Sequence, residues 1–299
     1  MTLDKSPERA RPEAIQAVPV RHPGRWVAVA IIAILAAQFV HMLVTNKNFQ
    51  WSFIADNAFR PPVIEGVRTT IILTILSMVI GVALGVVIAV MRLSDNPVLR
   101  GVGFLYTWFF RAVPRIVLMV LFGNMGVLYA EYGFGLPFTA QLSDLMGVDI
   151  HGTLFSIDAN TIMTGFMAGL LALALSEAAY MAEIVRAGLL SVDEGQTEAA
   201  SALGMSKLQI LRRIVLPQAM RVIVPPTGNE TISMLKDTAL VAYVPVTNEL
   251  FFQLQAVGAR EFQLFPMLVA ACLWYMVLTT VLMIVQYYIE RYYAKGSTR

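Results

Sequence analysis

The chain has little of the residue types that build disulfides and metal centres. Its 299 residues include one cysteine, Cys272, and three histidines, His22, His41 and His151. One cysteine cannot form a disulfide within a chain, and a cysteine-based metal site needs several. The histidines lie in unrelated segments, so the sequence predicts neither a metal centre nor a serine–histidine–acid catalytic set.

A phosphate-binding loop is also missing. The chain has no G-x-x-x-x-G-K-[ST] segment, and the "KGST" near its end follows no predicted strand. The sequence therefore predicts no ATP hydrolysis by this chain.

Charged residues are scarce. They make up 14% of the chain and hydrophobic residues make up 57%, whereas soluble domains average about 25% charged and about 45–50% apolar. This composition indicates a membrane protein. The net charge of +2 is too small to indicate nucleic acid as a partner.

Six apolar segments are long enough to cross a bilayer, whose core needs about 20 residues of helix. The first lacks a cleavage site after it, so we interpret it as a retained span. The fifth contains Pro217, Pro225 and Pro226, and we expect the helix to break at the last two. The six predicted spans are 26–44, 69–91, 107–130, 161–184, 210–241 and 265–289.

Lysine and arginine predict the orientation. With the N-terminus inside, the inner segments hold fourteen Lys and Arg and the outer loops hold three, as the positive-inside rule requires. We therefore expect 1–25 and 291–299 to be cytoplasmic tails. The outer loop 131–160 contains acids and no base.

A polar, alanine-rich stretch, "EAASALGMS" (198–206), lies between the fourth and fifth spans, on the predicted cytoplasmic side. Gly204 stands where a glycine can adopt the left-handed conformation without steric cost. We predict a helix over 192–203 and a second helix from Lys207, joined by a rigid corner. Such a corner is a plain connector, a face packed against the bundle, or a docking surface for another protein.

Two serines near this corner have the spacing of capping boxes. Ser191 stands three residues before Glu194, and Ser206 three residues before Gln209. In this motif the serine oxygen accepts a backbone N–H and the Glu or Gln reaches back to the serine N–H. We expect each serine to begin a helix.

Paired glycines indicate close packing between helices. Gly81 and Gly85 form one G-x-x-x-G pattern, and Gly165 and Gly169 form another. In apolar helices this pattern lets backbones approach each other.

The wider sequence is more specific. "EAASALGMSKLQILRRIVLP" reads E-A-A, three residues, G, nine residues, I-x-L-P, and resembles the cytoplasmic signature of ABC importer permease subunits. The flanking "SEAAYMAEIVRAGLLSVDEGQ" and "QAMRVIVPPTGNETISMLKDTALVAYVPVTNEL" resemble the polar amino-acid branch, the histidine/glutamine/arginine-type permeases. The resemblance covers roughly 66–288.

The resemblance implies an all-α membrane protein with a type I ABC importer transmembrane domain over 66–288. Its five-helix core would be joined by one additional N-terminal helix, 26–44, which agrees with an N-terminus inside. The E-A-A segment would form a coupling helix, about 192–204, that docks on a separate ATPase. The residues that this assigns to the interface are Gly195, Gln196, Glu198, Ala199, Ala200, Leu203 and Gly204.

The resemblance also implies the partners. A cytoplasmic ABC ATPase dimer would hold ATP and Mg, so we expect no cofactor on this chain. An external binding protein would deliver a polar amino acid, and a second permease subunit, identical or related, would complete a dimer in a bacterial inner membrane. Alternatives are an importer permease for an opine or amine, a secondary amino-acid transporter, and a non-transporting scaffold or sensor.

Ionisable side chains deep in a bilayer are functional candidates because inserting one costs about 2.5–3.5 kcal/mol. In the fifth span "PPTGNE" places Asn229 and Glu230 at mid-depth, where they suit the ammonium and carboxylate of an amino acid. Alternatively, Glu230 pairs with a cation from another span. Lys236 and Asp237 lie nearer the outer end and are candidates for an outer gate.

Two further groups complete the candidate pathway. Arg111 and Pro114 match the arginine–proline pattern of the resembled branch, and Arg111 either faces the substrate or is paired. Three residues spaced by three share a helix face near the cytoplasmic end of the fourth span. These residues are Tyr180, Glu183 and Arg186. Either Glu183 and Arg186 form a local ion pair, or the three residues transmit motion to an inner gate.

Overall fold

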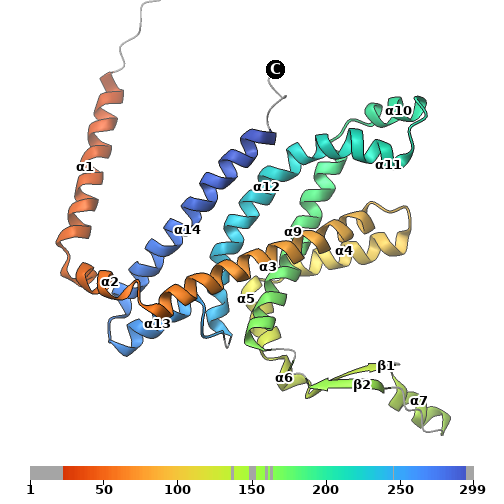
Figure 1. Cartoon of the computed structure of the whole chain (residues 1–299), viewed down its shortest axis with the longest axis horizontal. Coiled ribbons are helices and arrows are strands. Elements are labelled where there is room, and N and C mark those ends of the chain that lie inside the picture. The colour runs from red at the N-terminus through yellow and green to blue at the C-terminus, as the bar shows by residue number, and fades with distance from the viewer. Residues whose placement is uncertain are drawn as a thin grey trace, which may run out of the picture. The chain divides into compact units, whose positions relative to one another are not determined.

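The computed structural model of the chain describes residues 23–135, 138–147, 153–158, 161, 164–244 and 246–293 (Figure 1). Most of the predicted tail 1–25 and of the predicted tail 291–299 lies outside these residues. The chain divides into two compact units, Met1–Phe49 and Gln50–Arg299.

The first unit contains one long helix, α1 (Pro23–Thr45), followed by the 3-10 turn η1 (Lys47–Phe49). Its 23 residues correspond to about 35 Å of helix, at 1.5 Å per residue, which spans a core of about 30 Å. Apolar side chains surround α1 on all sides, as expected for a helix in lipid.

Four helices in the described residues are long and apolar enough to cross a membrane, and a bent pair makes a fifth candidate. The helix α12 (Leu216–Asp237) lies in the fifth predicted span but does not belong to this set, because Arg221, Glu230, Lys236 and Asp237 make it more polar. The candidates are α1, α3 (Pro61–Arg92), α9 (Gly165–Leu190), α14 (Leu264–Tyr293) and the pair α4–α5.

The third predicted span was wrong in its bounds and in its shape. The segment forms α4 (Pro97–Ala112) and α5 (Arg115–Gly123), which meet at an angle of 96°. The Asn96 side chain accepts hydrogen bonds from the first turn and so begins α4 ahead of the apolar run. Pro114 disfavours a helical conformation at the preceding residue, so the chain is extended there and bends.

The predicted break at Pro225 and Pro226 is also wrong, because α12 runs through both prolines without interruption. Thr227 donates to the carbonyl of Ile223 (2.8 Å), and Gln286 of α14 donates to the carbonyl of Pro225 (3.4 Å). These hydrogen bonds connect the proline segment to its own helix and to α14. A π-helical segment, η2 (Leu211–Val215), lies instead before α12.

The core lies between α3 and α9. A Cβ added at Gly81 would lie 2.7 Å from the Cγ of Glu177, and one added at Gly85 would lie 2.6 Å from the Cβ of Met181. These distances leave no room for a side chain, so the predicted close packing at the first glycine pair is confirmed. Gly169 packs similarly against Val241, at 3.0 Å.

Loop 131–160 contains structure that an all-α prediction does not include. Strands β1 (Glu131–Gly135) and β2 (Thr153–Asp158) pair antiparallel, with α7 (Thr139–Met146) between them. Phe134 and Phe155 stack across the two strands, with ring centroids 4.9 Å apart. Short elements also join the helices: α2 (Trp51–Asn57), α6 (Met125–Leu128), η3 (Thr238–Tyr243) and α13 (Leu250–Arg260).

A buried carboxylate fastens α13 to two long helices. Glu249 accepts hydrogen bonds from Thr70 of α3 and from Tyr275 of α14, both at 2.8 Å, and from the backbone N–H of Phe251 at 2.7 Å. Gly66 of α3 allows the backbone of α13 to approach closely. Burial raises the pKa of the Glu249 carboxyl, and the four hydrogen bonds that it accepts oppose this rise.

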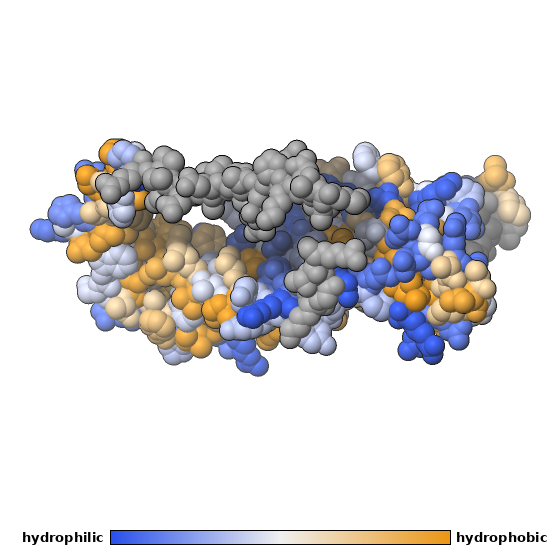
Figure 2. Space-filling model, turned by 90° about the horizontal axis from the view of Figure 1, so that it is seen from above, coloured by the Kyte–Doolittle hydropathy of each residue, from blue (hydrophilic) through white to orange (hydrophobic). Residues whose placement is uncertain are grey.

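Large apolar side chains remain exposed on the long helices. Val79 of α3, Leu105 of α4 and Met276 of α14 are each about 60% exposed. Figure 2 shows such residues, in orange, spread over the visible face. In water a surface of this kind would promote association, whereas in a bilayer it faces lipid.

Candidate functional site

The predicted helix–glycine–helix corner is present, between α10 (Glu194–Ala202) and α11 (Lys207–Ile210). Its first capping prediction was wrong. Ser191 still has helical backbone angles and donates to the carbonyl of Gly188 (2.7 Å), so it ends α9. Asp193, with extended backbone, caps α10 by accepting from the N–H of Gly195 (2.7 Å).

The second capping box is confirmed. Ser206 donates its N–H to the Oε1 of Gln209 (2.9 Å), and its Oγ accepts the N–H of Gln209 (3.4 Å). Gly204 has a φ of 79°, and the N–H groups of residues 204 and 205 close a Schellman motif on Ser201 and Ala200. Both ends of the turn are thus hydrogen-bonded, and the corner is rigid.

The corner presents one side outward and one inward. Leu203 is 83% exposed, so the turn presents a large apolar side chain outward. Ala200 is 4% exposed and faces inward, unlike its neighbour Ala199. Six of the seven predicted coupling residues are exposed: Gly195, Gln196, Glu198, Ala199, Leu203 and Gly204.

Inside the bundle, one arginine holds three acids from two helices. Arg115, at the start of α5, lies 2.9 Å from the Oε2 of Glu177, 2.5 Å from the Oδ2 of Asp237 and 3.6 Å from the Oε2 of Glu230. The Arg115 side chain is only 13% exposed, and Glu177 is fully buried. We refer to these four residues as the Arg115 cluster.

A second cluster has the opposite balance of charge, with one acid and three arginines. Glu183 of α9 pairs with Arg92 of α3, with Arg186 at 3.0 Å and with Arg111 of α4 at 3.6 Å. The local Glu183–Arg186 pair was one of the two predicted arrangements, and it is part of this larger set. We refer to these four residues as the Glu183 cluster.

Tyr180 lies between the two clusters. The guanidinium of Arg111 stands 5.6 Å from its ring centroid and that of Arg115 stands 5.0 Å from it. The two arginines lie on opposite sides of the α4–α5 bend, so the bend directs both toward one aromatic ring. Cation–π attraction of this kind is worth about 0.5–2 kcal/mol.

The structure separates residues that the sequence placed together. Glu230 faces the Arg115 cluster, whereas Asn229 accepts a hydrogen bond from Gln286 of α14 (3.0 Å). Asp237 likewise pairs with Arg115, whereas Lys236 is exposed and lines a small pocket with Asn229. Adjacent residues on a helix differ by about 100° in direction, which divides each pair between two faces.

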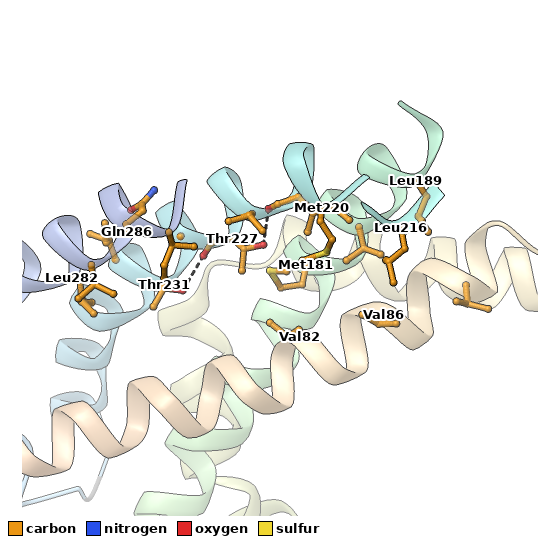
Figure 3. Close-up of a pocket in the computed structure, with 18 of the residues that line it drawn as sticks. Val82, Val86, Met181, Leu189, Leu216, Met220, Thr227, Thr231, Leu282 and Gln286 are labelled. Carbon is orange, nitrogen blue, oxygen red and sulfur yellow. Dashed lines mark hydrogen bonds between the residues drawn. The ribbon is translucent and has the colours of Figure 1, made fainter. Parts of the chain in front are cut away.

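A groove of about 550 Å³ lies between α3, α9, α12 and α14 (Figure 3). Nearly all its walls are apolar, from residues such as Val82, Met181 and Met220. The hydroxyls of Thr227 and Thr231 donate to carbonyls of their own helix, as the dashed lines in Figure 3 show. The groove therefore suits acyl chains or apolar side chains better than a charged amino acid.

Sequence reasoning missed Arg115, Glu177 and Arg92 as site residues. Glu177 lies inside an apolar run, so the rule that ionisable residues within spans are functional could have found it. Arg115 lies inside the predicted third span, so the same rule could have found it, whereas Arg92 ends α3, where a basic residue is common. Their roles are visible only in the structure, where α3 and α5 pack against α9 and each arginine meets an acid of α9.

The comparisons with known proteins agree with this architecture. Residues 81–295 match the family described as binding-protein-dependent transport system inner membrane component. The chain belongs to this family. It is therefore a membrane-spanning permease subunit of an ABC importer, and not itself an enzyme.

Individual relatives are similar over most of the chain. The arginine transport system permease protein ArgU of Corynebacterium glutamicum is 44% identical over 290 residues, covering 97% of this chain and 86% of that one. The probable amino-acid permease protein YxeN of Bacillus subtilis is 36% identical over 249 residues, covering 83% of this permease and 98% of that one.

A solved structure shares the fold. The crystal structure of an amino acid ABC transporter with histidines contains a chain 30% identical to this permease, with a TM-score of 0.62. The match covers 78% of this chain and 94% of that chain. The type I importer fold expected from the sequence is thus confirmed.

Proposed function

We propose that this permease imports a polar amino acid, and that its α10–α11 corner receives the force of ATP hydrolysis from a separate ATPase. The relatives are amino-acid permeases by name. The observation that carries the coupling proposal is the corner itself, which is rigidly capped at both ends and yet presents Leu203 and Gly204 outward. A plain connector would need neither feature.

The proposed assembly contains this permease, a second identical or related permease, a cytoplasmic ATPase dimer that holds ATP and Mg, and an external binding protein. Both termini, including 1–25 and 291–299, are proposed to lie in the cytoplasm of a bacterial cell. The helix α1 is proposed as an addition to a five-helix core over 66–288.

Two exposed acids on α10 provide a matched test of the coupling proposal. Glu198 belongs to the E-A-A segment and Glu194 lies one turn before it, outside the segment. We expect Glu198→Lys to reduce amino-acid uptake at least about ten-fold, while Glu194→Lys, with the same change of charge, retains most uptake. A ten-fold loss corresponds to about 1.4 kcal/mol of coupling.

The readouts are uptake by cells and ATP hydrolysis by the purified complex, with insertion checked by immunoblotting of membranes. Uptake of Glu198→Lys at the wild-type level, with normal dependence on ATP, would overturn the proposed role of the corner.

The Arg115 cluster supports a cationic side chain as the substrate class. It contains three carboxylates and one guanidinium, a formal charge of −2. Glu177 also has a buried oxygen, Oε1, without a hydrogen-bond partner within the described part of the chain. An incoming guanidinium or ammonium would supply the missing charge and donors, which agrees with the arginine permease among the relatives.

Substrate competition tests this part of the proposal. We expect arginine or lysine to stimulate ATP hydrolysis by the complex, given its binding protein, more strongly than glutamine does. Replacing Glu230 with Gln should raise the KM for the cationic amino acid about five-fold or more. A KM unchanged by Glu230→Gln would separate this residue from the pathway without affecting the coupling test.

A further inference from the structure

A basic pocket lies at the end of three helices, away from the Arg115 cluster. Its volume is about 380 Å³, and it is formed by the last turn of α3, the first turns of α4 and the end of α9. Three arginines line it, and no acid is among the described residues of its wall. The lining consists of Arg92, Leu93, Pro97, Arg100, Gly101, Phe104 and Arg186.

The positions of these residues place the pocket near a membrane surface. The span α3 ends at Arg92, and the bent span α4–α5 begins at Pro97. Arg186 lies four residues before the end of α9, which is about 6 Å along the helix. All three candidate spans thus have an end here, on the side that the lysine and arginine count predicts to be cytoplasmic.

The charge around the pocket is strongly positive. One acid, Glu183, is shared by Arg92, Arg111 and Arg186, and Arg100 adds a further exposed cation. Arg92 directs Nη1 to both Glu183 and Thr107, and its guanidinium carbon lies 5.6 Å from the Phe104 ring. Its side chain is thus held in place at the wall of the pocket before any ligand binds.

Arginine suits phosphate because its planar fork offers parallel N–H donors. A surplus of arginines alone would accept a soluble phosphate equally well, so the surrounding surface decides the class of ligand. Phe104 and Trp108 follow Arg100 at intervals of four along α4, and they are 57% and 58% exposed. These two rings lead from the basic pocket along the span, in the direction that acyl chains would take, beside an adjoining pocket that Arg111 and Glu183 also line.

We propose that this pocket binds the phosphate headgroup of an anionic phospholipid, with the acyl chains lying along Phe104 and Trp108. Basic pockets between spans on the cytoplasmic side are known to suit such headgroups. Because Arg92, Arg111 and Arg186 all reach Glu183, a bound headgroup would hold the ends of α3, α4 and α9 together around that carboxylate.

The test uses the full-length chain with its bound subunits, in mixed micelles that contain phosphatidylglycerol or phosphatidylcholine. Native mass spectrometry measures the lipid that stays bound. We expect phosphatidylglycerol to be retained in preference, and Arg100→Glu to weaken its apparent affinity at least about five-fold. Arg100 is exposed, so this variant should fold. The control is Arg213→Glu, which changes an exposed arginine outside this pocket in the same way.

Three results would overturn the proposal. The first is equal retention of the two lipids by the wild type, and the second is equal retention of phosphatidylglycerol by Arg100→Glu and Arg213→Glu. The third is displacement of the bound lipid by millimolar inorganic phosphate, which would assign the pocket to a soluble phosphate. Failure of lipid binding would leave the coupling and uptake tests unaffected, since those measure other surfaces.

Discussion

At the scale of single residues, the buried charges of the bundle depend on their pairing with one another. A charge moved out of water needs a partner, because the desolvation penalty is several kcal/mol for each ion. Arg115 meets this need for three acids at once, and Tyr180 covers its face. The arrangement stabilises the acids while leaving an excess of negative charge.

Removing Arg115 should therefore destabilise the protein strongly. We expect Arg115→Met to lower the free energy of unfolding by about 3–5 kcal/mol, because fully buried Glu177 would lose its partner. The double variant Arg115→Met/Glu177→Gln should recover part of this loss. Thermal unfolding of the purified permease in detergent measures both.

The control for this prediction is Arg60→Met. Arg60 pairs with Glu261 at 3.4 Å, and both side chains are well exposed, at 45% and 39%. Its removal should cost less than about 1 kcal/mol. Equal effects of the two arginine substitutions would mean that burial of the Arg115 cluster does not determine its energy.

Glu249 should make stability depend on pH. Burial raises its pKa above the ordinary value of 4.5, so the folded protein binds this proton more tightly than the unfolded chain. The free energy of unfolding should then fall as the pH rises from about 4.5 through the folded pKa. Glu249→Gln removes the titration, so the wild type should lose stability relative to this variant between pH 5 and pH 8.

Tm values at the two pH values measure this difference. The matched control is Glu65→Gln, which removes an exposed carboxyl, 53% accessible, at the start of α3 and should keep the wild-type pH dependence. A Glu249→Gln variant with the same pH dependence as the wild type would exclude Glu249 as its source.

At the scale of elements, contact between helices decides more than the propensity of any one helix. The prolines of α12 would break an isolated helix, yet within the bundle α12 continues through them, and Gln286 of α14 donates to the carbonyl of Pro225. The glycines of α3 would weaken an isolated helix, yet they are what allows α9 to pack against it.

Substitution of two glycines should show this difference. Gly85→Ala places a Cβ 2.6 Å from Met181, and we expect overpacking to cost about 1–3 kcal/mol. Gly101→Ala, on α4, meets no atom within 4 Å, and we expect a gain of up to about 1 kcal/mol from helix propensity. Thermal unfolding checks both, and a Gly85→Ala variant as stable as the wild type would contradict the packing argument.

At the scale of the whole molecule, the charge distribution predicts which side each loop faces. The α10–α11 corner lies in a segment predicted to be inner, and α7 lies in the loop 131–160, which is predicted to be outer and contains no Lys or Arg. The proposed coupling to an ATPase requires the corner to be cytoplasmic, so the topology is a direct test of it.

Labelling of introduced cysteines tests this orientation. The single native cysteine is first replaced by Cys272→Ala, and Ser201→Cys on α10 and Asp144→Cys on α7 are added separately. We expect an impermeant maleimide to label position 144 in intact spheroplasts and position 201 only after permeabilisation. Labelling of position 201 in intact spheroplasts would reverse the topology and contradict the coupling proposal.

Local signals in the sequence were enough for some of these features. The capping box at Ser206, the turn at Gly204 and the apolar spans α1, α3, α9 and α14 depend on neighbours within a few residues or on composition. Short-range hydrogen bonding and transfer from water act on such segments in the same way whatever lies around them. The E-A-A spacing likewise identified the family before any contact was known.

Tertiary structure decided the features that need two distant segments to meet. The sequence placed Glu230 beside Asn229, but the direction of α12 sends one to Arg115 and the other to Gln286. The side chain that donates to the carbonyl of Pro225 in α12 comes from Gln286, 61 residues away in the sequence. By itself, the sequence determined that this protein spans a membrane and forms a helix–glycine–helix corner between two spans. Only packing decided which charges meet, because pairing inside a bundle depends on helix rotation and bend.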